Sequence, residues 1–313
     1  MTIGIGAYGS NAGRAVYDAL KAAEKVGSGA IGGFVTFAAI GEGGVLYRAE
    51  TQRGGSMTLF TEGETTGVEP PAVVATARFA GLISSGPDRP EPLAQYLTAD
   101  AKGGLVTGHR IPPATGVSGE AINCEALGLL VSGKSAFEAV DQVIDANPEA
   151  DCGLIAIDIR GGVHLRNTKR ADGRPDLGVA LKQDEESGAT VGVLHNAITP
   201  HPVLAELVAA IALGTMIGAR EPAGWVTITA GTPVGMGLEN AVYCNAAGNA
   251  ERITTTDPAI GERGELGVAI YLASAVYLEG ALVGHTTFEP ITATENGRLL
   301  SLSGKTSLRM SYR

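Results

Sequence analysis

Histidines are the residues of this chain best suited to moving a proton near neutral pH, and their positions are uneven. The chain holds five histidines, and three of them fall in the segments TGHRIPPATG and LHNAITPHP, which each follow an expected strand and precede an expected helix. An unperturbed imidazole has a pKa that suits proton transfer at this pH. If the units of the chain pack around a common centre, we expect these loops to meet in one pocket, contributing His109, Arg110, His195, Asn196 and His201.

The corresponding loop of the first unit carries Tyr8, Ser10 and Asn11, and we expect Ser10 and Asn11 to face the same pocket. The helix N-termini that follow such loops favour an anionic small molecule. Two alternatives stay open: three of the histidines could hold a metal, although no local ligand motif supports this, or the loops could simply cap helices and face water. We predict no metal and no cofactor.

A glycine pattern near the start of the chain formally matches the fingerprint of dinucleotide-binding turns. Gly4, Gly6 and Gly9 stand in GIGAYG ahead of an expected helix, where backbone N–H groups could hold a pyrophosphate. Only Thr2 and Ile3 precede the first glycine, which is too little for the buried strand that the motif requires. We therefore interpret the segment as a glycine-rich turn from strand to helix.

The order of elements around residue 151 is typical of a different chemistry. The segment DCGLIAID begins a strand with Cys152, a hairpin follows, and the partner strand ends at Thr168 before KRADGRPDLG. With GAYGSNAGRAVYDALKAAEKVGSGA earlier in the chain, this arrangement resembles the asparaginase-type branch of the N-terminal-nucleophile (Ntn) hydrolases, over roughly residues 1–180. In that family a precursor cuts itself before a residue that opens a strand, and the freed residue attacks an amide.

The resemblance implies a role for each matching residue. Cys152 would be the nucleophile, Thr168 a second hydroxyl beside it, and Arg174 and Asp176 the groups that grip the α-carboxylate and α-amine of a substrate. A nucleophile whose own freed amine acts as base needs no triad, only donors for the oxyanion. We expect His195 or His109 to line the same cleft.

Two other interpretations of the nucleophile are available. Cys152 is also explained as a small buried residue at the start of a strand, which is where free cysteines commonly lie. Thr2 is a second candidate, because a methionine before threonine is readily removed and this leaves an N-terminal threonine without self-cleavage. The strand that begins at Thr2 leads into a helix, however, rather than into the hairpin usual for such a nucleophile.

The elements that must position these residues recur in the order strand, helix, strand, strand. The pattern predicts three such units, at about residues 1–60, 100–170 and 189–250, followed by a C-terminal β segment, all in one domain. Ser135 and Glu138 predict a capping box at the start of one helix. Tight glycine hairpins favour antiparallel strands. We therefore predict an α+β fold, a layered αββα sandwich of antiparallel sheet and helices like that of the Ntn hydrolases.

Composition and charge exclude several classes of protein. A charged fraction of 18% with a mean hydropathy of +0.15 excludes a disordered chain, and a net charge of −10 argues against a nucleic-acid partner. No uninterrupted apolar run reaches the roughly 18 residues that a membrane span needs. The three cysteines are too scattered for a disulfide framework. We expect a cytoplasmic protein, and the apolar stretches LVAAIALGTMIGA and VAIYLASAVYL favour a homo-oligomer.

These observations lead to two functional hypotheses. The first is an Ntn-like amide hydrolase that acts on a small carboxylate-bearing amide in cytosolic amino-acid metabolism. The second is a non-processed protein of the same architecture that binds a small anion through its strand-to-helix loops and does no covalent chemistry. Self-cleavage between Asp151 and Cys152 would separate the two.

Overall fold

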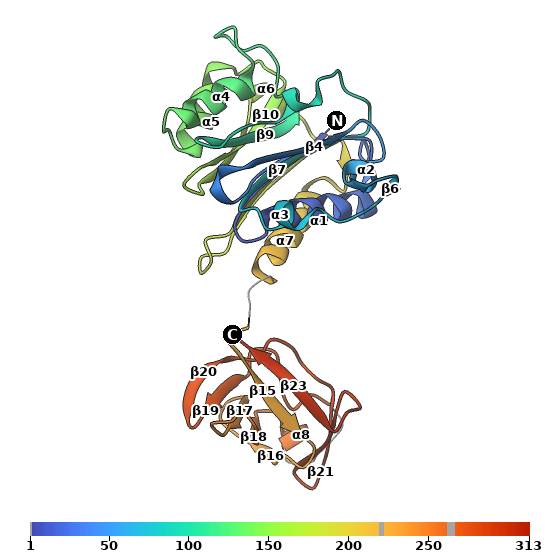
Figure 1. Cartoon of the computed structure of the whole chain (residues 1–313), viewed down its shortest axis with the longest axis vertical. Helices are drawn as coiled ribbons and strands as arrows, with labels where there is room; N and C mark the ends of the chain where they lie inside the picture. The colour runs from blue at the N-terminus through green and yellow to red at the C-terminus, as the bar shows by residue number, and fades with distance from the viewer. Residues whose placement is uncertain (1, 219–221, 262–266) are drawn as a thin grey trace. The chain divides into compact units, whose positions relative to one another are not determined.

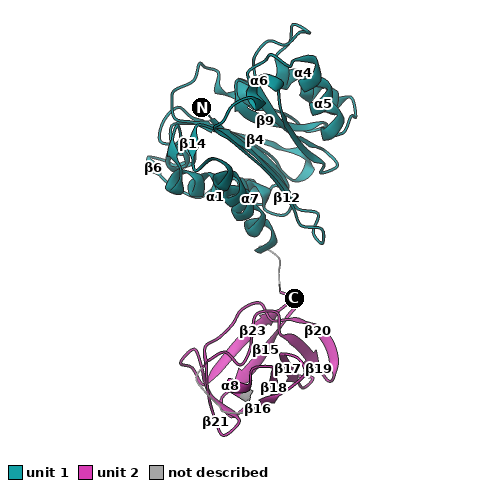
Figure 2. Ribbon diagram, turned by 180° about the vertical axis from the view of Figure 1, so that it is seen from behind, with its two compact units in different colours: residues 1–220 teal, residues 221–313 magenta. Residues whose placement is uncertain are grey.

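The chain folds into two compact units, residues 1–220 and 221–313 (Figure 2). The computed structural model describes residues 2–218, 222–261 and 267–313. The chain therefore departs from the single domain expected from its recurring pattern. The strand and helix of the expected third unit belong to the first compact unit, whereas its two following strands belong to the second.

A six-stranded antiparallel sheet, the large sheet, forms the centre of the first unit. Its strands lie in the order β12-β13-β1-β7-β3-β4, and β1 pairs with a strand on each side. The bounds are β1 (Thr2–Tyr8), β3 (Phe34–Ile40), β4 (Leu46–Thr51), β7 (Phe79–Ser85), β12 (Leu177–Gln183) and β13 (Thr190–Asn196). Because β1 is buried on both faces, its sequence is apolar or glycine at nearly every position.

A second antiparallel sheet, the small sheet, packs against one face of the large sheet. Its four strands lie in the order β11-β10-β9-β8, with the bounds β8 (Thr98–Asp100), β9 (Gly104–Arg110), β10 (Cys152–Asp158) and β11 (Val163–Asn167). The hydroxyl of Thr107 on β9 donates a hydrogen bond of 2.8 Å to the carbonyl oxygen of Leu82 on β7, which joins the two sheets directly.

Helices cover the outer face of each sheet, so that the layers follow the order α, β, β, α (Figure 1). Helices α1 (Ala12–Val26) and α7 (His201–Gly218) lie side by side on the large sheet, and α4 (Ile122–Val131) and α5 (Ala136–Ala146) lie on the small sheet. Helix α5 begins with the predicted capping box: the Ser135 side chain accepts a hydrogen bond from the Glu138 N–H, and the Glu138 side chain accepts one from the Ser135 N–H.

Short elements complete the first unit. They are the helices α2 (Ser56–Leu59), α3 (Ala72–Ala75) and α6 (Lys169–Asp172), the 3₁₀ turns η1 (Glu42–Gly44) and η2 (Leu93–Tyr96), and the strand pairs β2 (Ser28–Gly29) with β14 (Ile198–Thr199) and β5 (Thr61–Glu62) with β6 (Thr65–Thr66).

Glycine at position 4 allows the two sheets to approach each other closely near the start of β1. A Cβ atom at Gly4 would lie 2.1 Å from the carbonyl oxygen of Gly108 on β9. Since backbone atoms cannot move aside as a flexible side chain can, a larger residue at position 4 would push the sheets apart. The crossing of β1 and β9 at this point brings the ends of several strands together.

The second unit is formed almost entirely of strands. A five-stranded sheet has the order β16-β18-β17-β19-β20, with the bounds β16 (Val234–Met236), β17 (Ala241–Cys244), β18 (Ala250–Thr255), β19 (Ala275–Leu278) and β20 (Ala281–His285). Two further pairs are β15 (Gly224–Thr229) with β23 (Ser307–Tyr312) and β21 (Thr292–Glu295) with β22 (Arg298–Leu302), and α8 (Pro258–Gly261) is a single turn. Val242, Ile253 and Val276 are fully buried in its separate hydrophobic core.

The predicted α+β class with antiparallel sheets is confirmed. The closer likeness to the Ntn hydrolases stays a prediction.

We predict that Gly4→Ala destabilises the first unit by roughly 1–3 kcal/mol, because the added methyl group meets a backbone oxygen across the two sheets. Urea unfolding followed by far-UV circular dichroism would measure the change. Gly128→Ala is the matched control: Gly128 is exposed in α4 with open space around it, so this change should stabilise the unit by about 0.5–1 kcal/mol. An equal response of the two variants would contradict the close approach.

Candidate functional site

Thr2 lies at the start of the central strand of the large sheet, and both its side chain and its backbone are held. The residue is fully buried. Its hydroxyl oxygen accepts a hydrogen bond from the backbone N–H of Arg110, and its own backbone N–H donates to Oδ1 of Asn196 at 3.2 Å. Thr2 and Asn196 are register partners on β1 and β13. The close crossing of β1 and β9 therefore places a hydroxyl and a backbone nitrogen among groups from three strands.

Arg110 ends β9 in a conformation that side-chain-bearing residues rarely adopt. Its φ is 65°, in the left-handed region, and residues held in this region tend to cluster at functional sites. This conformation accompanies the N–H contact to Thr2. The Arg110 side chain forms a two-pronged ion pair with Asp151, and that contact lowers the pKa of the Asp151 carboxyl. Both side chains are less than one-fifth exposed, at 16% and 19%, so the ion pair is largely shielded from solvent.

His109 faces the large sheet from β9 and is fully buried. Its Nε2 lies 2.8 Å from Oδ1 of Asn167 on β11. The two side chains flank Gly153, where a Cβ atom would lie 2.2 Å from the Asn167 oxygen and 2.7 Å from Nε2. Burial lowers the pKa of His109 to about 4, although the contact with Asn167 acts in the opposite direction. The imidazole is therefore neutral at pH 7.

Two buried polar atoms of this cluster have no hydrogen-bond partner among the residues that the structure describes. They are Nδ1 of His109 and Nδ2 of Asn196. A buried donor or acceptor left unsatisfied costs about 1–3 kcal/mol, so such a group calls for an explanation. Asn196 accepts the hydrogen bond from the Thr2 N–H. His109 directly precedes Arg110, whose N–H donates to the Thr2 hydroxyl. We call Thr2, His109, Arg110, Asn167 and Asn196 the Thr2 cluster.

His195 and His201 lie on the other side of the large sheet. Successive residues of a strand point to opposite faces, so His195 faces the helix layer while its neighbour Asn196 faces the small sheet. His195 Nε2 lies 2.7 Å from the carbonyl oxygen of His201, and His201 Nδ1 lies 2.9 Å from that of Ile198. Burial is the main cause that lowers the pKa of His195 to about 4. The prediction that His195 and His109 line one cleft is therefore wrong in its placement of His195.

Arg174 and Asp176 are paired with each other. The guanidinium Nε and Nη2 atoms of Arg174 lie 2.8 and 2.6 Å from the two carboxylate oxygens of Asp176. This contact raises the pKa of Arg174 and lowers that of Asp176. The carbonyl oxygen of Asp176 accepts a hydrogen bond from Ala197, directly after Asn196. The pair thus lies near the Thr2 cluster, but its guanidinium is already engaged.

Cys152 does not have the environment of a nucleophile. It is fully buried in the hydrophobic cluster between the small sheet and helices α4 and α5. Burial raises the pKa of its thiol to about 12, and the Asp151 charge adds to the effect. Since the thiolate is the reactive form, the structure contradicts the nucleophile role expected from the family resemblance. The plain alternative, a small buried residue at the start of a strand, accounts for Cys152.

Thr168 serves as a helix cap. Its side-chain oxygen accepts a hydrogen bond from the Ala171 N–H at the start of α6, and its hydroxyl lies 2.6 Å from the carbonyl oxygen of Ala150. The side chain is thus fully used within the fold. The structure gives no support to a second catalytic hydroxyl at this position.

Ser10 and Asn11 lie at the opposite end of the large sheet from Thr2, beyond the end of β1. Seven residues of strand separate the two ends, which is about 20 Å. Asn11 precedes α1 with a φ of 58°. The expectation that this loop joins the histidine loops in one pocket is therefore wrong.

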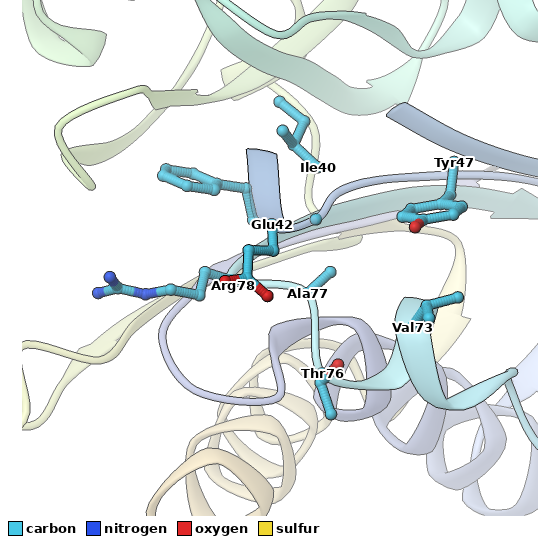
Figure 3. A pocket seen from close by; sticks show the side chains of 9 residues that line it. Ile40, Glu42, Tyr47, Val73, Thr76, Ala77 and Arg78 are labelled. Atoms are coloured by element: carbon cyan, nitrogen blue, oxygen red, sulfur yellow. The ribbon is translucent and has the colours of Figure 1, made fainter. Parts of the chain in front are cut away.

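A cavity of about 640 Å³ lies at this opposite end, between the β3–β4 turn and the segment before β7 (Figure 3). Tyr47 and Val73 line one part of it, and Glu42 and Arg78 line another. The guanidinium of Arg78 donates a hydrogen bond of 2.6 Å to the Tyr8 hydroxyl. None of the residues predicted from the sequence to form a site lines this cavity.

Asn167 and Asp151 were not among the predicted site residues. Their contacts depend on which strands pair: β10 lies between β9 and β11, so Gly153 has both His109 and Asn167 as register partners. No spacing along the chain signals this arrangement. Among the residues that the structure describes, no group of three or more histidine, cysteine, aspartate or glutamate side chains is arranged to hold a metal ion.

Two family models match the chain. One, described as Domain of unknown function (DUF6963), covers residues 2–225, and the other, described as Domain of unknown function (DUF7259), covers residues 231–307. The two matches follow the division into two compact units. No curated protein matches the chain. Since neither description states an activity, the function must be inferred from the geometry of the site.

The buried histidines predict that the first unit loses stability as the pH falls. In the unfolded chain their pKa is about 6.5, against about 4 in the folded protein, so the unfolded state binds more protons between these values. The free energy of unfolding should therefore fall by up to about 1.4 kcal/mol per pH unit for each histidine between pH 6.5 and 4. Urea unfolding at a series of pH values, followed by far-UV circular dichroism, would measure this slope.

His109→Gln should remove about half of this slope, whereas His285→Gln, which changes an exposed histidine of the second unit, should leave it intact. The same slope in the wild type and in His109→Gln would show that His109 is not buried as a neutral imidazole.

Proposed function

We propose that this chain, which belongs to the family described as Domain of unknown function (DUF6963), is an amide hydrolase of the N-terminal-nucleophile type in which Thr2 is the nucleophile. The observation that carries the proposal is that Thr2 makes two hydrogen bonds: its hydroxyl oxygen accepts one from the Arg110 N–H, and its backbone N–H donates one to Asn196. The αββα layers agree with the resemblance to the Ntn hydrolases. The proposal moves the nucleophile from Cys152 to Thr2, the second candidate.

Cleavage of the peptide bond before Thr2 would turn its backbone nitrogen into an α-amine. This amine takes the proton from the Thr2 hydroxyl as the oxygen attacks the carbonyl carbon of the substrate amide. The amine then passes the proton to the leaving nitrogen as the C–N bond breaks, which leaves an acyl ester on Thr2. Water hydrolyses this ester in a second step, with the same amine as base. Asn196, which holds the nitrogen at 3.2 Å, orients the base.

The unpartnered groups of the Thr2 cluster suit the remaining needs of this reaction. Among the residues that the structure describes, the Nδ2 group of Asn196 is a buried donor without a partner. A preorganised donor of this kind stabilises the oxyanion of the tetrahedral intermediate. His109 is neutral at pH 7 because burial lowers its pKa to about 4. Because Nε2 donates to Asn167 Oδ1, Nδ1 can accept a hydrogen bond from the substrate, and the ring adds no positive charge.

The charges around Thr2 favour a small amide with an uncharged acyl group. The guanidinium groups of Arg110 and Arg174 are each closed in a two-pronged pair with a carboxylate. Binding a substrate carboxylate would require one of these pairs to open. The proposal therefore keeps the small amide of the sequence-based hypothesis and replaces its carboxylate with a neutral group.

Mass spectrometry of the purified protein would test the nucleophile. We expect an N-terminal threonine, and we expect p-nitrophenyl acetate, used as a small acyl probe, to leave an acetyl group on the Thr2 peptide. Thr2→Ala should lower ester turnover by about 10³-fold or more and Asn196→Ala by roughly 10²-fold, whereas Thr2→Ser should retain part of it.

Cys152→Ala is the matched control, because the thiol lies outside the cluster, and it should label and turn over as the wild type does. A chain that keeps the residue before Thr2, or labelling that persists in Thr2→Ala, would overturn the proposal. In the first case the non-covalent binding of a small anion becomes the better explanation.

A further inference from the structure

We propose that the outer face of α7 binds a second copy of this chain, with the two α7 helices antiparallel across a two-fold axis. The face carries an apolar stripe, the α7 stripe, formed by Val203, Leu207, Ala210, Gly214 and Ile217. Val203 is 62% and Leu207 39% exposed, and Ala210 and Gly214 are also exposed. An exposed apolar surface of this kind on a folded unit is typical of an interaction site.

The neighbouring helix shows that this face is unusual. Helices α1 and α7 lie side by side on the large sheet (Figure 1). The outer surface of α1 is charged: Arg14 pairs with Asp18 at 2.8 Å, and Lys21 pairs with Glu69 at 3.1 Å. Helix α7 contains no lysine or arginine, and its one acidic residue, Glu206, is paired with Lys182 of β12 at 2.6 Å. Within the same helix layer, the exposed surface of α1 is thus suited to water, whereas the exposed surface of α7 is suited to an apolar partner.

The spacing of the stripe favours a helix as the partner. Its members follow one another at intervals of four, three, four and three residues, which is the 3.5-residue repeat by which one helix packs along another. Two of the central positions are Ala and Gly, which permit a close approach of the helix axes.

A membrane is the less suitable partner. By length and composition alone α7 could cross a bilayer, although its apolar residues do not form an uninterrupted run. The opposite face of α7, however, is buried against the large sheet and α1, with Leu204, Val208 and Met216 in the core. A helix that lies on a membrane surface typically carries basic residues beside its apolar face, and α7 has none.

The stripe is complementary to itself when it is reversed. With a two-fold axis beside Ala210 and Ile211, Leu207 of each copy lies against Gly214 of the other, and the two Ala210 side chains lie near the axis. A large residue then meets a small one on both sides of the axis, which is the condition for a closed, isologous dimer. A stable interface buries roughly 800 Å² on each partner, so the mixed charges of α1 would form its rim, where Arg14 and Lys21 of one copy can meet Asp18 of the other.

Size-exclusion chromatography of the whole chain, with the molar mass measured by light scattering as the protein elutes, would test the interface. We expect the wild type to be a dimer at micromolar concentration and Leu207→Glu to be a monomer, because two carboxylates would be buried without partners. Lys169→Glu, which changes an exposed residue of α6 beside the small sheet, is the matched control and should remain a dimer. Circular dichroism establishes that each variant is folded.

Cysteine cross-linking tests the two-fold axis. Cys124 is the exposed cysteine of the first unit, and Cys152 and Cys244 are buried, so Cys124→Ser supplies the background. Ala210→Cys in this background should form a disulfide-linked dimer on mild oxidation, because its two copies lie near the axis, whereas Lys169→Cys, on α6 beside the small sheet, should not. A monomeric wild type, a dimeric Leu207→Glu variant or the absence of the Ala210→Cys cross-link would each overturn the proposal. If the monomeric wild type also sediments with neutral phospholipid vesicles, the α7 stripe binds a membrane instead.

Discussion

The close approach of the two sheets at Gly4 and Gly108 is the constraint on which the rest of the first unit depends. Because a Cβ atom at Gly4 would lie 2.1 Å from a backbone oxygen of β9, the two strands cross almost in direct contact. The end of β9 therefore lies beside the start of β1, and the backbone of Arg110 reaches the hydroxyl of Thr2. A wider separation would leave room for water between the sheets and would break this contact.

The polar groups at this crossing are mostly neutral, and burying those without a hydrogen-bond partner lowers the stability of the folded unit. The pKa of His109 is lowered by burial, and two buried nitrogen atoms lack a protein partner among the described residues. A sequence selected only for stability would replace such groups with apolar ones. Their presence between the two sheets is the reason that our proposal begins at Thr2.

Much of the fold could be predicted from the sequence, because strands and helices leave periodic patterns and glycine marks the turns between them. The capping box of α5 and the strand that begins at Cys152 are examples. The convergence of His109, Arg110 and Asn196 was also predictable, since each lies at the end of a strand and strand ends gather at the edge of a sheet. These predictions needed only the position of a residue along its element.

The predictions were wrong where the position of a side chain depends on which face of a strand it occupies or on the direction of the neighbouring strand. Cys152 faces the helices, whereas its neighbour Gly153 faces the large sheet; His195 and Asn196 diverge in the same way. A shift of one residue exchanges these faces, and only the pairing of strands fixes it. Ser10 and Asn11 were misplaced because β1 runs antiparallel to β13, so the end of one lies beside the start of the other.

The division of the chain near residue 220 has a consequence for how such proteins change over time. Every member of the Thr2 cluster comes from residues 2–196. The first family match ends at residue 225 and the second begins at residue 231. Each half has its own hydrophobic core. A gene that exchanged its second half for another module would therefore still encode every residue of the Thr2 cluster together with the hydrophobic core that positions it.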